Sequence, residues 1–213
     1  MNKYIYWSLL AVFIASCSTP EEENPVKEDV PEVLTEETFN FDESEFEDSV
    51  HIEILKELDI CDLNFSDSSM YAPCTPEYFQ ILPFHKDKSI KDAFVLYVKA
   101  AIPLKGFPYL LPVRHVIVFE RENGRLVRLN GFRGELVEMR DGKNGYKDLI
   151  VSLYLTGDET LFDCLFTYEN KKYSFESVEG IDWGEGMRKV KESVKDSVSK
   201  EVYNDLMEKS LIF

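Results

Sequence analysis

The chain has 213 residues, of which 44% are hydrophobic and 30% are charged, a composition typical of one globular domain with additional segments. Its formal net charge of −16 argues against a nucleic-acid partner and against a basic patch that adsorbs to anionic lipid. The acidity is concentrated in residues 18–50, which hold thirteen acidic side chains and one basic side chain, Lys27, so the remainder is only mildly acidic.

The N-terminal segment has the three parts of an export signal. Lys3 precedes an apolar run over residues 5–14, which is too short to cross a hydrocarbon core of about 30 Å, and small residues follow. The segment ends in Ile14-Ala15-Ser16-Cys17, which resembles the lipobox of bacterial lipoproteins. The resemblance implies a signal peptide over residues 1–16 and acylation of Cys17 with chains such as palmitate, which would hold the protein stably on a membrane.

The residues after the lipobox carry two further expectations. Ser18 at the position after the lipidated cysteine favours the outer membrane in lipoproteins of this kind. The acidic stretch over residues 18–23 resembles a surface-export signal of some Gram-negative lipoproteins, although it is equally consistent with a solvated linker. Residues 17–45 are too polar to bury a core, so we expect a disordered acidic linker. The folded domain would be displayed either to the periplasm or on the cell surface.

The body of the chain, residues 46–213, is expected to be a single β-rich domain of the α+β class. Ser44 and Glu47 have the spacing of a capping box, and an apolar stripe at intervals of four follows, which predicts a short helix ending near Asp59. The stripe consists of Phe46, Val50, Ile54 and Leu58.

From Tyr78 onward the apolar period changes to two, and turn sequences follow at short intervals. We therefore expect an antiparallel meander of about six to eight strands in one sheet. The pair Asn123-Gly124 predicts a tight hairpin turn with positive φ, and residues 131–134 are expected to form another turn. The expected strands after Tyr78 are residues 94–100, 113–120, 126–130, 135–140, 147–155, 161–168 and 172–177.

A helical period returns after Trp183. Apolar residues at spacings of 3, 4, 4, 4 and 4 predict a long amphipathic helix that covers one face of the sheet. They are Met187, Val190, Val194, Val198, Val202 and Leu206.

Three cysteines remain besides Cys17. Export would place them in an oxidising compartment, and Cys61 and Cys74 bracket a loop without periodic apolar residues, so we expect a disulfide between them. Cys164 alternates with Phe162 and Phe166 and is expected to be a buried, inert thiol.

No motif for catalysis, a cofactor or a metal is evident. His51, His85 and His115 lack metal-ligand spacing, and His115 alternates with apolar residues as a core histidine does. The turn over residues 141–148 resembles the Asp/Gly-rich calcium turns of integrin-type propeller repeats, and residues 59–67 resemble a degenerate version. Lys143 stands at a ligand place in the first turn, so turn formation without a metal is the favoured interpretation.

The sequence favours a non-catalytic binding or structural module of the envelope, anchored at the outer membrane. Its partner would be an envelope or extracellular protein or glycan. An inhibitor or immunity protein that acts on an exported enzyme and an envelope hydrolase remain alternatives. The segment over residues 107–112, framed by prolines and containing Phe107, Tyr109 and Leu110, is the candidate contact loop, with a loop folded back onto the core as the alternative.

Overall fold

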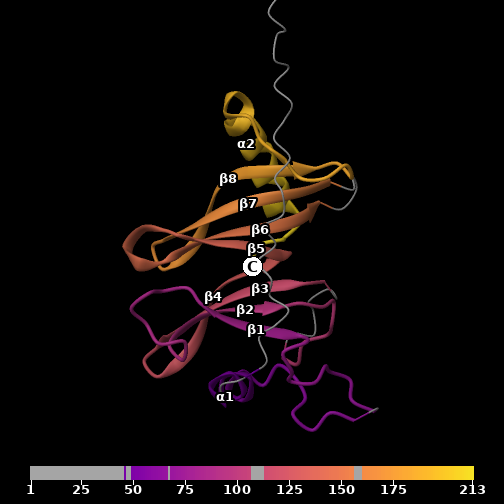
Figure 1. Cartoon of the computed structure of the whole chain (residues 1–213), viewed down its shortest axis with the longest axis vertical. Coiled ribbons are helices and arrows are strands. Elements are labelled where there is room, and N and C mark those ends of the chain that lie inside the picture. Colours follow the sequence, from indigo (N-terminus) through magenta and orange to yellow (C-terminus); the bar gives the residue numbers. More distant parts are fainter. Residues whose placement is uncertain (1–45, 47–48, 67, 107–112, 156–159) are drawn as a thin grey trace, which may run out of the picture. The chain divides into compact units, whose positions relative to one another are not determined.

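The computed structural model describes residue 46 and residues 49–66, 68–106, 113–155 and 160–213 (Figure 1). The lipobox with Cys17, the acidic linker with Ser44, and the candidate contact loop with Phe107, Tyr109 and Leu110 lie outside the described residues. The described part is mainly β-structure with two helices, a short one before the strands and one near the C-terminus.

The strands of the described residues form two antiparallel sheets, where the sequence predicted one. In each sheet, strands that follow one another in the chain are neighbours (Figure 1). The first sheet consists of β1 (Phe79–Pro83), β2 (Ala93–Val98), β3 (His115–Glu122) and β4 (Arg125–Arg133). The second consists of β5 (Glu135–Asp141), β6 (Lys147–Leu155), β7 (Thr160–Glu169), β8 (Lys172–Asp182) and β9 (Arg188–Lys189).

The chain passes from one sheet to the other at Gly134, the single residue between β4 and β5. A Cβ atom on Gly134 would overlap the backbone oxygen of Ser152 and the side chain of Leu153. The transition therefore depends on a close backbone approach that only glycine permits. An ion pair between Arg114 and Glu135 lies beside this transition.

Strand β2 lies between two hydrophobic cores, and all six of its residues are buried. Ala93, Val95 and Tyr97 contribute to a core that also contains side chains of the five-stranded sheet. The alternate residues Phe94 and Leu96 face a second core with the helix α1 (Ser49–Leu58). The predicted period of two is therefore confirmed for this strand over residues 94–98, and both of its faces are buried.

The prediction of a turn over residues 131–134 is wrong, whereas the prediction of a turn at Asn123-Gly124 is confirmed. Asn123 and Gly124 have φ of 50° and 80°. Strand β4 instead continues through Gly131, because the C-terminal segment pairs with it: the Gly131 amide donates to the Phe213 carbonyl at 2.7 Å, and the Phe213 amide donates back at 2.9 Å.

The C-terminal helix α2 (Glu192–Glu208) begins later than the apolar spacing predicted. The expected first turn belongs to β9, and the amide of Val190 donates to the Glu179 carbonyl of β8. Sheet pairing therefore overrides the helical spacing before residue 192. Within α2, Val202 and Leu206 enter the core shared by the two sheets, and Ser199 Oγ accepts a hydrogen bond from the Val178 amide of β8.

Candidate contact surface

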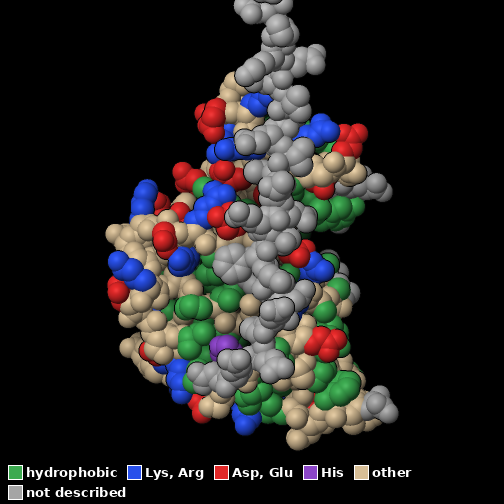
Figure 2. All heavy atoms as spheres, viewed as in Figure 1, with side chains coloured by type: hydrophobic (Ala, Val, Ile, Leu, Met, Phe, Trp, Pro, Cys, Tyr) green, Lys and Arg blue, Asp and Glu red, His purple; other side chains and the backbone are tan. Residues whose placement is uncertain are grey.

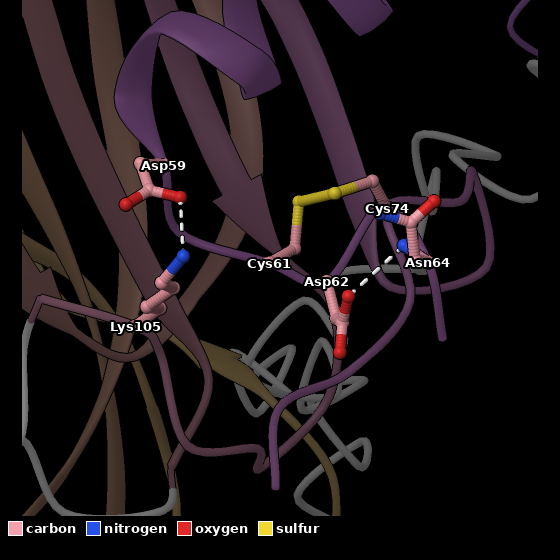
Figure 3. Close-up of a disulfide and its surroundings, with 6 residues drawn as sticks. All are labelled: Asp59, Cys61, Asp62, Asn64, Cys74 and Lys105. Atoms are coloured by element: carbon pink, nitrogen blue, oxygen red, sulfur yellow. Dashed lines mark hydrogen bonds and ion pairs between the residues drawn. A yellow bond between two sulfur atoms is a disulfide. The ribbon is translucent and has the colours of Figure 1, made fainter. Parts of the chain in front are cut away.

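The loop over residues 61–74, called the stapled loop below, is closed by the predicted disulfide between Cys61 and Cys74, which is confirmed (Figure 3). The two Cα atoms are 5.2 Å apart, and both cysteines are buried in the core beside α1. Next to the disulfide, the Asp62 amide donates to the Ala72 carbonyl at 2.8 Å and the Cys74 amide donates to the Asp62 carbonyl at 3.3 Å. Both ends of the loop are therefore fixed on the domain.

The polar groups of the stapled loop bond to one another. The Asp62 carboxylate accepts hydrogen bonds from the Asn64 amide at 2.9 Å and from the Ser69 hydroxyl at 2.8 Å (Figure 3 draws the first). The Ser66 amide donates to Ser69 Oγ at 2.9 Å, so Ser69 links both halves of the loop. The hydrogen bonds from Ser69 and Asn64 lower the pKa of the Asp62 carboxyl, because they favour its charged form.

The large apolar side chains of the same loop are exposed to solvent. Leu63 is 49% exposed, Phe65 is 51% exposed and Met70 is 77% exposed. In the space-filling view, hydrophobic side chains form part of the visible surface where the chain leaves α1 and runs through this loop (Figure 2). A loop whose polar groups bond to one another while its large apolar side chains stay exposed has the arrangement of a contact surface rather than of a solvated turn.

The chain that leads into the predicted contact loop is fixed next to the stapled loop. The Lys105 amide donates to the Ile60 carbonyl at 2.9 Å, and Lys105 Nζ pairs with Asp59 Oδ1 at 2.6 Å (Figure 3). Residues 107–112 follow directly in the chain and are outside the described residues. The structure therefore places Lys105, two residues before that segment, beside residues 59–61.

A groove of about 500 Å³ lies between β8 and α2 and is the second candidate site. One of its walls is held by Asn130, whose amide group both accepts from the Tyr173 amide at 2.5 Å and donates to the Tyr173 carbonyl at 3.2 Å. The charged side chains around the groove have both signs and come from Lys172, Glu176, Asp196 and Lys200. This mixed, open lining does not single out a reaction or a ligand.

The other residues singled out from the sequence have structural surroundings. Burial raises the pKa of the Cys164 thiol, which is fully buried, as predicted, and forms no disulfide among the described residues. His115 is also fully buried, and neither ring nitrogen makes a hydrogen bond of good geometry. Burial, with the positive charge of Arg133, lowers its pKa to about 4. His51 lies on α1 and His85 follows β1, so the three histidines belong to separate segments.

The two turns that resemble calcium sites are held by protein contacts. Asp141 pairs with Lys147 at 2.5 Å, and Asp62 is held by the hydrogen bonds within the stapled loop. Asn144 and Gly145 adopt positive φ of 59° and 80° in the first turn. Across the described ranges, no cluster of three acidic, histidine or cysteine side chains is placed to hold a metal ion, and no helix is long and apolar enough to span a bilayer.

Sequence reasoning missed Leu63, Phe65 and Met70 as surface residues. The available signal was their position: three large apolar residues stand among Ser, Asp and Asn inside a short loop flanked by cysteines. Such residues lack the periodicity that would place them in a core. Comparisons of the chain with protein-family models, with curated proteins and with solved structures find no significant match.

Proposed function

We propose that this chain is a lipid-anchored protein of the bacterial outer membrane whose folded domain binds a partner in the envelope or outside the cell. The observation that carries the binding role is the stapled loop, which exposes Leu63, Phe65 and Met70 while its polar groups bond to one another. The disulfide and these hydrogen bonds fix the loop before binding, which lowers the entropy lost on association.

The anchor rests on Ile14-Ala15-Ser16-Cys17, and the acidic residues that follow would extend as a tether. In this arrangement residues 17–45 hold the domain away from the membrane surface, facing the periplasm or the cell exterior. Phe107, Tyr109 and Leu110 would add to the contact surface, because Lys105 fixes the preceding chain beside the stapled loop.

An inhibitor or immunity protein is a special case of this function that the same observation favours. A rigid loop with protruding apolar side chains is the form that fits an enzyme cleft. In that case the partner would be an exported enzyme, and the chain would act by occupying its cleft.

The anchor is tested with Cys17→Ala. We expect this variant to fold with an unchanged unfolding temperature but to appear in the soluble fraction after a carbonate wash of membranes. Retention of the variant in washed membranes would remove the lipid anchor from the proposal.

The binding role is tested by cross-linking in intact cells followed by affinity purification. The loop variant Leu63→Ser/Phe65→Ser/Met70→Ser should lose a partner that the wild type retains. The matched control Val194→Ser/Met207→Ser removes exposed apolar side chains from α2 and should retain it. If both variants retain the same partners, the stapled loop is not the contact element.

A further inference from the structure

The stapled loop is charged as well as apolar. Residues 61–74 contain two acidic side chains, at positions 62 and 67, and no basic side chain. Asp62 is kept in its charged form by the hydrogen bonds from Ser69 and Asn64, which lower the pKa of its carboxyl. The nearby Lys105 adds no net positive charge, because it is paired with Asp59.

We infer that the partner of the stapled loop is a protein with an apolar pocket rimmed by lysine or arginine side chains. This inference rests on the proposed binding function and specifies the partner's chemistry. Leu63, Phe65 and Met70 fill the pocket, and the negatively charged Asp62 carboxylate faces the basic rim. Charged groups around an apolar anchor steer the encounter and select the partner.

The same charge disfavours a bilayer as the occupant. Exposed apolar loops can enter membranes, but bacterial membranes carry anionic lipids, and an acidic loop without cations is repelled by them. A second copy of this chain would present the same negative loop, so self-association through this surface brings like charges together.

The effect of the charge of the stapled loop can be tested by substitutions at Asn64. Its backbone amide donates to Asp62, but its side chain is exposed and makes no hydrogen bond or ion pair among the described residues. Asn64→Asp and Asn64→Lys therefore change the loop charge by one unit in opposite directions without removing a hydrogen bond. Asn64→Gln is the neutral control.

The experiment uses the full chain with p-benzoylphenylalanine at position 65 in each Asn64 background. Short pulses of light in intact cells give the rate at which the cross-linked product forms. We expect Asn64→Lys to slow capture about two- to five-fold, Asn64→Asp to speed it, and Asn64→Gln to match the parent, with differences that shrink at high salt. The cross-linked peptide of the partner should contain lysine or arginine close to the attachment point.

Several outcomes would overturn the inference while leaving the binding function standing. These are equal capture by Asn64→Asp and Asn64→Lys, faster capture by Asn64→Lys, or a cross-link to the chain itself. Binding of the Cys17→Ala protein to vesicles of phosphatidylethanolamine and phosphatidylglycerol that is lost in Phe65→Ser would instead identify a lipid surface as the occupant. If the protein with p-benzoylphenylalanine at position 65 and the native Asn64 gives no cross-linked product, the binding function is rejected as well.

Discussion

Gly131 must be a glycine because a neighbouring side chain leaves no room for a Cβ atom, and not because of its backbone conformation. The ring of Phe213 lies directly over it, with the guanidinium group of Arg128 5.0 Å from the ring centroid on the same surface. A methyl group on Gly131 would overlap this ring. The glycine therefore allows the C-terminal segment to pair with β4.

Gly131→Ala is expected to lower the free energy of unfolding by about 1–3 kcal/mol, because the added methyl group forces Phe213 or β4 to move. Urea unfolding measures the change. The same substitution in a Phe213→Ala background should cost much less, since the overlap is removed. An equal cost in both backgrounds would show that the Phe213 contact is not the cause.

His115 is expected to make stability depend on pH. Burial lowers its pKa from 6.5 to about 4. At a pH between these two values, the unfolded chain binds a proton at His115 and the folded chain does not. The contribution of the neutral His115 to the free energy of unfolding is therefore complete above pH 6.5 and is lost as the pH falls toward 4.

This prediction is measured as the free energy of unfolding of the wild type and of His115→Leu in a pH series from 7.5 to 4. The wild type should lose more stability than the variant over the acidic part of the series, because the variant has no imidazole to protonate. Parallel curves for the two proteins would contradict the buried, neutral state of His115.

At the scale of elements, α2 is attached to the sheets through a narrow stripe. Leu206 is fully buried in the shared core, whereas its neighbour Met207 is 54% exposed. The aromatic rings of Phe175 and Tyr203, 5.4 Å apart between centroids, continue the contact between β8 and the helix.

Leu206→Ala should therefore destabilise the domain by about 2–5 kcal/mol, and Met207→Ala should change stability by less than about 0.5 kcal/mol. Thermal or urea unfolding of the two variants gives the comparison at adjacent positions of one helix. Similar losses from both would mean that α2 is oriented differently from the structure.

The stapled loop depends on its disulfide. Cys61→Ser/Cys74→Ser is expected to cost about 3 kcal/mol, the amount that closing a loop of this length removes from the unfolded state in the chain-entropy model. Reduction of the wild type should reproduce the loss. A Cys164→Ala variant is the control, and it should keep the bridge and its sensitivity to reductant; a double serine variant as stable as the wild type would contradict the prediction.

The elements that were predictable from sequence are those in which local patterns agree with the final pairing. Strand β6 has the predicted bounds, 147–155, and the Asn123-Gly124 turn forms, because alternation and positive φ are local properties. The division into two sheets was not predictable, since it depends on the contact of Gly134 with Ser152 in another strand. The exposure of Leu63 and Phe65 was indicated by their position among polar residues between two cysteines, whereas the place of the bridged loop on the domain was not.

At the scale of the whole domain, polar and aromatic contacts connect the two sheets in addition to the core that they share. Glu120 of β3 pairs with Lys88 and accepts a hydrogen bond from the Tyr168 hydroxyl of β7 at 3.1 Å. The ring of Tyr168 stacks on Tyr146 at 3.7 Å between centroids. These contacts link the four-stranded sheet to the five-stranded one, while the stapled loop packs against the other core with α1.

The most direct test of the central claim, that the stapled loop is the contact element, is photo-cross-linking from Phe65→p-benzoylphenylalanine in intact cells. Tyr154→p-benzoylphenylalanine is the control, because Tyr154 is an exposed aromatic residue on β6. We expect a discrete partner product from position 65 and none from position 154. No product from position 65, or the same products from both positions, would contradict it.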